Sequence, residues 1–471
     1  MLKQLRIQNF KCWKDTGAIR MARITLFFGV NSSGKSSIGQ FLMMLKQTVE
    51  SPDRKTVFYP GGKSSAVRLG SYQEMVFHRD PINKIIFDYQ WSLPETLKFR
   101  DSVNRQEFSG DSLVFHAEVG LGDKEDKNQH TLMVHRLNYD LLQMDEIKLS
   151  ICMERQSDNT KCKYKVDATN FMLKRNPGRV WYPGAPVRFY GFPDEVVAYY
   201  QNADFVQNLN LLHEKLFSTL CYLGPLRTKA ERLYIWSGTN PESVGYDGEN
   251  TIAAILAARN RKISLGYKRP AKPFEEIIAL KLREMGLIEE LKVNPISEQR
   301  QEYEVKIRTR GSSDWVDLPD VGFGISQVLP VIVQCFYAPA GSIIIVEQPE
   351  IHLHPSAQSA LADVMIDAIN AREDGKDRNI QLIIETHSEH FLRRIQRRIA
   401  EDVVSQGKVS AYFANITKTP ATLDPLQIDI FGNIQNWPEN FFGDEMGDIT
   451  EQAKASIKKR MQKDEKPEAS E

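Results

Sequence analysis

Three short runs of consecutive apolar residues stand out against the mixed pattern of the chain. They lie at residues 24–28, 342–347 and 379–385. Uninterrupted runs of this length fit strands that are buried on both faces of a parallel sheet. A helical pattern follows each run, so the sequence predicts an α/β fold with a mixed sheet and flanking helices.

Between residues 60 and 195 the pattern changes to alternating runs, which predict an antiparallel β region inserted into this fold. From 195 to 290, apolar residues recur every three or four positions, so we expect a helical subdomain there. Residues 302–308 and 314–318 predict a hairpin that leads back to the core. The last stretch, from 452 to 471, is charged and poor in large apolar residues, and we expect it to fray or be disordered.

Composition excludes several classes of protein. The 61 basic and 61 acidic side chains cancel, which argues against a globally basic nucleic-acid binder. We find no apolar run long enough to span a membrane, and we expect no membrane partner. The five cysteines have no C-x-x-C spacing and are typical of a reduced, cytoplasmic protein.

A glycine loop connects the first apolar run to the helix expected at 36–49. Its sequence, GVNSSGKS at residues 29–36, matches G-x-x-x-x-G-K-[ST], and the strand and helix around it are those that a phosphate-binding loop requires. A chance glycine turn would lack this context. The lysine would reach the β- and γ-phosphates, and the serine hydroxyl after it would bind Mg²⁺. The expected nucleotide-binding residues are Gly29, Asn31, Ser32, Ser33, Gly34, Lys35, Ser36 and Ser37.

The second apolar run ends in Glu347. A carboxylate at the carboxyl end of a central strand lies where α/β sheets bind ligands. We therefore expect Glu347 to hold Mg²⁺, directly or through water, opposite Ser36.

Histidines follow both later runs, and each has a plainer interpretation. His387 can reach a γ-phosphate or the attacking water, but a histidine in this position is more often structural. His352 and His354, with Glu350, suggest a metal site, although their tight spacing favours a loop or a helix start.

Glycines also precede the helix that starts near residue 323. Gly322 and Gly324 are either ordinary loop glycines or part of a second anion-binding helix start, which would bind the nucleotide of another subunit.

Taken in order, these segments resemble the SMC/RecF/OLD branch of ABC-type ATPases, and most of all OLD-like ATPases and the ATPase subunits of anti-phage systems such as Septu. The resemblance covers about residues 1–50 and 315–445. It rests on IQNFK at 7–11, GVNSSGKSS at 29–37, VGFGISQ at 321–327, EQPEIHLHP at 347–355, THS at 386–388, and the later NWP at 436–438 and FFG at 441–443.

The resemblance implies two ATPase heads that enclose two ATP molecules, each with Mg²⁺. It makes Gly322, Gly324 and Ser326 the signature segment, Glu347 the Walker B acid and His387 the switch histidine. It also offers Gln73 as a metal-binding glutamine, although an ordinary loop role is at least as well supported.

Two departures from the family pattern matter. The signature segment lacks the serine-glycine-glycine order. Gln348 occupies the position of the catalytic glutamate, and an amide cannot accept a proton from water. We therefore expect slow hydrolysis, with Gln348 orienting water and Glu350 as a substitute base.

The expected domains follow from these segments. Residues 1–60 and 301–445 form the two parts of the ATPase head, 61–195 the β insertion, 196–300 the helical subdomain, and 446–471 the tail.

Three functions fit the sequence. The first is an ATPase whose nucleotide-dependent dimer, or larger homo-oligomer, controls a separate effector such as a nuclease, since no Toprim nuclease follows the head. The second is an ATP-locked scaffold that binds nucleic acid, for which Arg393, Arg394, Arg397 and Arg398 form a basic patch unless acids pair with them. A transporter subunit is the third and weakest. The sequence does not decide whether Arg227 reaches phosphate or an acid.

Overall fold

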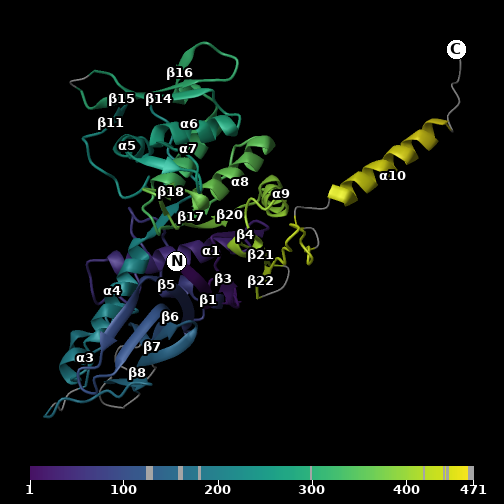
Figure 1. The fold of residues 1–471 in the computed structure, drawn as a ribbon. Helices are drawn as coiled ribbons and strands as arrows, with labels where there is room; N and C mark the ends of the chain where they lie inside the picture. Colours follow the sequence, from purple (N-terminus) through teal and green to yellow (C-terminus); the bar gives the residue numbers. More distant parts are fainter. Residues whose placement is uncertain are drawn as a thin grey trace, which may run out of the picture.

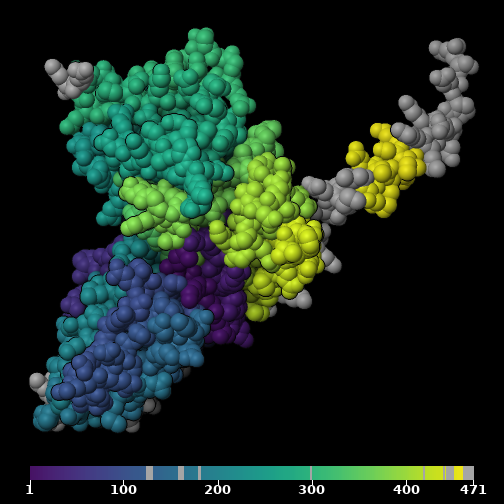
Figure 2. Space-filling view, in the orientation of Figure 1, coloured from purple at the N-terminus to yellow at the C-terminus, as the bar shows by residue number. Residues whose placement is uncertain are grey.

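The computed structural model describes residues 1–122, 131–156, 163–178, 182–297, 300–416, 420–438, 441 and 445–464. A parallel sheet lies in the middle of the molecule, with an antiparallel sheet on one side and smaller sheets and helices on the other (Figure 1). The space-filling view shows these two sides as lobes (Figure 2). Phe442 and Gly443 of the C-terminal motif, and the last seven residues of the tail, lie outside the described residues.

The central sheet has six strands in the order β10-β17-β20-β4-β21-β22. The first five are parallel and β22 is an antiparallel edge strand. Every residue of β17 and β20 is buried, as their apolar runs predict. The strands are β10 (Leu220–Leu223), β17 (Ile343–Glu347), β20 (Gln381–Glu385), β4 (Ile24–Gly29), β21 (Val409–Asn415) and β22 (Thr422–Pro425).

The central sheet separates two hydrophobic cores because alternate residues of each strand face opposite sides. Ile344 and Val346 of β17 belong to the core that includes the helices after the later strands. Ile343 and Ile345 belong to the core shared with the first helix and the antiparallel sheet. The helices around the sheet are α1 (Lys35–Glu50), α4 (Phe205–Ser218), α7 (Phe323–Tyr337), α8 (Pro355–Asn370) and α9 (Glu389–Ala400).

The antiparallel sheet has eight strands, and β1 at the N-terminus is one of them. Its order is β2-β1-β5-β6-β7-β8-β9, with β3 also paired to β1. The first long strand of the expected insertion, β5, pairs directly with β1. The insertion therefore belongs to the same sheet as the first strands of the chain. The strands are β1 (Leu2–Phe10), β2 (Trp13–Asp15), β3 (Ile19–Arg20), β5 (Ile85–Arg100), β6 (Glu107–Leu121), β7 (Leu132–Gln143), β8 (Glu146–Gln156) and β9 (Lys163–Thr169). The short α2 (Tyr72–Met75) and a 3₁₀ turn at Phe77–Arg79 precede β5.

Residues 196–300 differ from the helical subdomain that we expected. The apolar face of α4, including Val206 and Leu209, packs into the core of the antiparallel sheet. Leu220 continues the apolar spacing of α4, but it begins β10 and joins the central sheet. Periodicity shows that a helix is amphipathic, but it does not show which layer covers its apolar face.

The second lobe combines short strands with α5 and α6. One sheet has the order β11-β15-β14, with β16 paired to β15, which confirms the expected hairpin; a second has the order β13-β12-β18-β19. The elements are α3 (Asp194–Tyr199) before α4, then β11 (Tyr234–Ile235), α5 (Thr251–Ala257), β12 (Lys262–Ser264), β13 (Ala271–Pro273), α6 (Phe274–Glu284), β14 (Glu290–Pro295), β15 (Glu302–Arg308), β16 (Trp315–Asp317), β18 (Arg372–Glu373) and β19 (Lys376–Asp377).

The C-terminal segment differs from our expectation of disorder. Residues Glu445–Asp464 form a helix, α10, which lies apart from both lobes in Figure 1. Its sequence is rich in glutamate, lysine, glutamine and alanine, which favour helices without tertiary packing. Lys454 also pairs with Glu451 one turn earlier. In the part of the chain that the structure describes, no helix is both long and apolar enough to cross a membrane.

Candidate nucleotide-binding site

The glycine loop joins β4 to α1, as the sequence predicts. Gly29 has a φ of 142° and Gly34 a φ of 91°, which L side chains rarely adopt. A Cβ atom on Gly29 would lie 2.4 Å from the Ala414 carbonyl oxygen, and one on Gly34 would lie 2.2 Å from the Cys12 sulfur. Both positions therefore require glycine, for backbone conformation and for space.

The Lys35 side chain folds back into the loop. Its ammonium donates to the carbonyl oxygens of Gly29 at 2.9 Å and Val30 at 2.8 Å. Burial lowers the pKa of Lys35, while Glu385 and Glu350 act in the opposite direction. The loop thus holds a buried cation beside its backbone, as a phosphate-binding loop requires.

The loop serines occupy two different environments. Asn31 and Ser32 are exposed on the loop, where they can meet a ligand, and Ser33 is buried. Ser37 is also buried, and its hydroxyl accepts a hydrogen bond of 2.7 Å from the Trp13 indole. That bond fixes α1 against the N-terminal strands, so the geometry gives Ser37 a structural task.

Two carboxylates end neighbouring strands next to the loop. Glu347 on β17 and Glu385 on β20 are register partners. The Ser36 hydroxyl donates a 3.0 Å hydrogen bond to Glu385 Oε1. We expected Glu347 opposite Ser36, but β20 lies between β17 and β4, so the nearest carboxylate belongs to β20.

Glu347 is held on the other side by Tyr222, whose hydroxyl donates to its Oε1 at 2.9 Å. Burial and the Glu385 charge raise the pKa of Glu347 to about 7. Burial likewise raises the pKa of Glu385. The negative charges of two adjacent buried carboxylates repel each other and are stabilised by a cation. Mg²⁺ prefers oxygen ligands, so the oxygens of Ser36, Glu347 and Glu385 fit this ion.

Glu385 was missed in the sequence. Its signal was present, because it ends the run at 379–385 just as Glu347 ends the run at 342–347. Gln73, the expected metal-binding glutamine, is exposed on α2, and the structure describes no hydrogen bond between its side chain and Ser36, Glu347 or Glu385. A metal-binding role for Gln73 stays a prediction.

The segment after β17 crosses toward the end of β20. Gln348 has a φ of 45°, which is unusual for a residue other than glycine. Its backbone N–H donates a 2.8 Å hydrogen bond to the Glu385 backbone carbonyl. Glu350 is buried, and its Oε1 accepts a 2.7 Å hydrogen bond from the His387 amide. The three expected catalytic residues, Gln348, Glu350 and His387, are therefore in adjoining segments at the same sheet edge.

The His387 side chain is exposed at that edge, although desolvation and the Lys35 charge still lower its pKa. His354 is the N-cap of α8 and accepts from the Ser356 amide at 3.3 Å. The helix-start interpretation of His354 is thus confirmed. No group of three or more histidine, cysteine, aspartate or glutamate residues suited to a metal occurs among the described residues.

Arg227 lies beneath the end of β17. Its guanidinium donates to the Glu347 carbonyl at 2.9 Å, and the side chain is buried. Burial lowers its pKa to about 10. Arg227 thus supports the backbone that carries Glu347, and the charges of Glu350 and Glu347 act against the lowering of its pKa.

The Gly322 to Ser326 segment begins α7. Gly322 is the exposed N-cap, and a Cβ on Gly324 would lie 2.8 Å from the His352 carbonyl oxygen. The Phe323 ring packs edge-on against the His352 ring at 4.8 Å, and the Ser326 hydroxyl donates to the Phe323 carbonyl. Within one chain this segment therefore contacts the loop before α8.

The four arginines of α9 all have acidic partners. Arg394 and Arg398 both pair with Asp363 on α8. Arg393 pairs with Glu389, and Arg397 with Glu401. Acid pairing, the plainer of the two interpretations, is the one that the structure shows.

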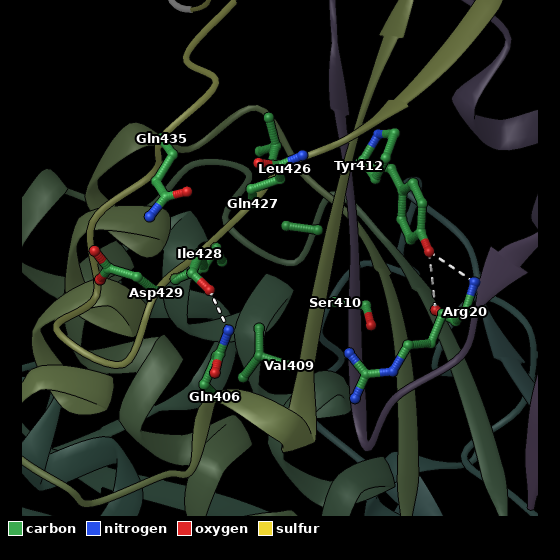
Figure 3. A pocket seen from close by; sticks show the side chains of 12 residues that line it. Arg20, Gln406, Val409, Ser410, Tyr412, Leu426, Gln427, Ile428, Asp429 and Gln435 are labelled. Atoms are coloured by element: carbon green, nitrogen blue, oxygen red, sulfur yellow. Dashed lines mark hydrogen bonds between the residues drawn. The ribbon is translucent and has the colours of Figure 1, made fainter.

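A separate hollow of about 430 Å³ opens between β21 and the segment around residues 425–435 (Figure 3). The Tyr412 hydroxyl spans one side of it through hydrogen bonds with the Arg20 backbone. The hollow lies along the first half of β21, whereas Gly29 pairs with Ala414 near its end. None of the candidate nucleotide-binding residues lines it.

Family models match three parts of the chain. Residues 1–171 match an AAA ATPase domain, and residues 204–393 match a family described as "AAA domain, putative AbiEii toxin, Type IV TA system". Residues 404–452 match a family described as a protein of unknown function, DUF3696. The two ATPase models together include the glycine loop and both strand-end carboxylates, and they support an ATPase of the AAA type. No curated protein was found to match the chain.

Solved structures with a similar arrangement include SMC heads. The SmcHead bound to the C-winged helix domain of ScpA has a TM-score of 0.44 at 11% identity, covering 91% of this chain and 98% of that one. The SMC head domain from Thermotoga maritima has a TM-score of 0.39 at 10% identity, covering 91% and 99%.

Proposed function

We propose that the chain binds ATP with Mg²⁺ between the glycine loop and the ends of β17 and β20. One observation carries the proposal: Ser36, directly after Lys35, is hydrogen-bonded to a buried strand-end carboxylate. The phosphates would lie against the loop amides and Lys35, and the cation would neutralise charge on the phosphate oxygens.

A hollow of about 520 Å³ beside the loop can take the nucleoside. It is lined by residues of the β1–β2 turn, including Lys11 and Cys12, and by the 3₁₀ turn around His78. Its volume is within the range of about 300–1,000 Å³ that is usual for small-ligand sites. The Cys12 sulfur lies 3.9 Å from the Ser33 carbonyl, so this hollow adjoins the phosphate loop.

We further propose that hydrolysis is slow. Gln348 can orient a water molecule but cannot take its proton, and a general base typically contributes about 10²–10⁴-fold to the rate. Glu350 is the substitute base in this proposal. Its Oε2 is buried without a hydrogen-bond partner among the described residues, so one oxygen is available.

Slow turnover favours a long-lived ATP-bound state, and we propose that this state pairs two heads. The segment from Gly322 to Ser326 supports this, because Gly322 and Phe323 are exposed at the start of a 15-residue helix. An exposed helix start presents unpaired amides that suit a phosphate of a second copy. The paired heads would then control a separate effector, such as a nuclease in anti-phage defence in the bacterial cytoplasm, as the OLD-like resemblance suggests.

The test is the mass of the protein in solution with and without MgATP. Wild type should shift to twice its mass with MgATP, and Gly322→Asp, which sets a negative charge at the helix start, should bind ATP but stay at its original mass. A wild type that binds ATP without changing mass would contradict the pairing. The nucleic-acid scaffold is less well supported, because the α9 arginines are paired with acids.

A further inference from the structure

Glu385 occupies a position that the recognised motifs leave unassigned. It ends β20, the strand between the glycine-loop strand β4 and the Glu347 strand β17. Its side chain is buried at 7% exposure, and its Oε1 accepts the Ser36 hydroxyl hydrogen bond. It is therefore the carboxylate in direct contact with the hydroxyl that the loop motif assigns to Mg²⁺.

The second oxygen of Glu385 has no hydrogen-bond partner in the part of the chain described here, although it is buried. A buried carboxylate oxygen without a donor is costly, so such an atom indicates a ligand or a cation. The Lys35 ammonium of the loop donates its hydrogen bonds elsewhere, to the carbonyl oxygens of Gly29 and Val30 and to the Ser33 hydroxyl. A divalent cation beside Ser36 would satisfy this oxygen.

Glu385 also lies beside the segment that follows Glu347 on the neighbouring strand. The backbone N–H of Gln348 donates a hydrogen bond to the backbone carbonyl of Glu385. Glu347 and Glu385 are register partners, so neighbouring strands each end in a carboxylate at this edge. Of the two, Glu385 is the one hydrogen-bonded to Ser36.

We propose that Glu385, together with Ser36, is a ligand of the divalent cation that accompanies the nucleotide, with Glu347 completing the acidic side of the site. The proposal rests on the proposed function and adds a named cation ligand to it. It differs from a purely structural role, in which Glu385 would only hold the Ser36 hydroxyl in place.

The test measures how nucleotide affinity depends on Mg²⁺. A fluorescent ATP analogue is titrated in EDTA and at rising Mg²⁺ concentrations against wild type, Glu385→Gln and a matched control, Glu304→Gln, which removes a carboxylate from the distant β15. We expect Glu385→Gln to need about tenfold or more Mg²⁺ to reach half of its full affinity. In EDTA it should bind the analogue at least as tightly as wild type, because one negative charge next to the phosphates is gone.

The outcomes separate the two proposals. Equal Mg²⁺ requirements for wild type and Glu385→Gln would overturn the cation role of Glu385. No binding by wild type under any condition would instead overturn the proposed function. Should Glu385→Gln fail to fold, Glu385→Asp replaces it. The electron paramagnetic resonance spectrum of Mn²⁺ bound together with the analogue is then compared between wild type and Glu385→Asp. A cation ligand predicts an altered Mn²⁺ spectrum, and identical spectra contradict it.

Discussion

The Ser36 hydroxyl and the Glu385 carboxylate, 349 residues apart in the chain, are joined by a hydrogen bond of 3.0 Å. This contact exists because β20 is inserted between β4 and β17 in the central sheet. The phosphate-binding loop thus meets first the carboxylate of β20, and Glu347 lies one strand further away. Both acids are at the carboxyl edge, where α/β sheets bind their ligands.

Turnover should respond to residue 348. Gln348→Glu supplies a carboxylate that can take a proton, so we expect kcat to rise about 10²-fold. Steady-state phosphate release under saturating MgATP measures it. An unchanged kcat would show that residue 348 does not limit hydrolysis.

Glu350 is tested separately. Glu350→Gln keeps the acceptor for the His387 amide through its carbonyl oxygen, but it removes the base. We expect kcat to fall about 10²-fold or more, with nucleotide affinity little changed. A wild-type rate in Glu350→Gln, measured in the same assay, would remove Glu350 from the mechanism.

Gly34 should tolerate no side chain. Gly34→Ala places a Cβ against the Cys12 sulfur and forces a φ near 91°, so we expect nucleotide binding to be lost. Gly341→Ala is the matched control, because Gly341 has a φ of 85° but nothing within 4 Å of its Cβ position. That variant should lose about 1 kcal/mol of unfolding free energy and bind nucleotide normally. Equal binding by both variants, measured by calorimetry, would contradict the importance of the close contact.

The α9 arginines should not govern nucleic-acid binding. Replacing Arg393 and Arg397 by alanine removes two exposed ion pairs, each worth at most about 1 kcal/mol. We expect unfolding free energy to change little, and DNA or RNA binding measured at low and high salt to be the same as in wild type. Binding that depends on salt in wild type and disappears in the variant would revive the scaffold function.

A buried histidine should make the antiparallel lobe sensitive to acid. His213 lies between two tyrosine hydroxyls, Tyr89 at 2.7 Å and Tyr139 at 2.8 Å, and burial lowers its pKa well below 6.5. The Tyr139 hydroxyl donates to the Tyr190 carbonyl, so His213 Nδ1 carries the proton and Nε2 accepts from Tyr89. The folded protein therefore contains a neutral imidazole.

The folded protein should lose stability as the pH falls. Below about pH 6.5, His213 takes up a proton in the unfolded chain but not in the folded one. This residue alone therefore lowers the free energy of unfolding by about 1.4 kcal/mol for each unit by which the pH falls. Denaturant unfolding of wild type and His213→Gln between pH 7 and 5.5 measures the difference in slope. The variant should be less stable at pH 7 but less dependent on pH, and His390→Gln, an exposed histidine, should match wild type. Identical slopes in wild type and His213→Gln would contradict a neutral buried histidine.

The local elements of the site were predictable from sequence, but their arrangement was not. The apolar runs before Gly29 and Glu347 predicted buried strands, and the glycine spacing predicted the loop. The role of Glu385 depends on strand order, which no local pattern encodes. Leu220 is a related case, because it continues the apolar spacing of α4 but begins the next strand, β10.

The central claim is that the glycine loop and the strand-end acids form one site for ATP with Mg²⁺. Isothermal titration calorimetry of wild type and Lys35→Ala with ATP, in Mg²⁺ and in EDTA, tests it most directly. We predict saturable binding by wild type that is tighter with Mg²⁺, and binding weakened about 100-fold or more in Lys35→Ala because a buried charge-assisted contact to phosphate is lost. Wild-type affinity unaffected by Mg²⁺, or equal in Lys35→Ala, would contradict the claim.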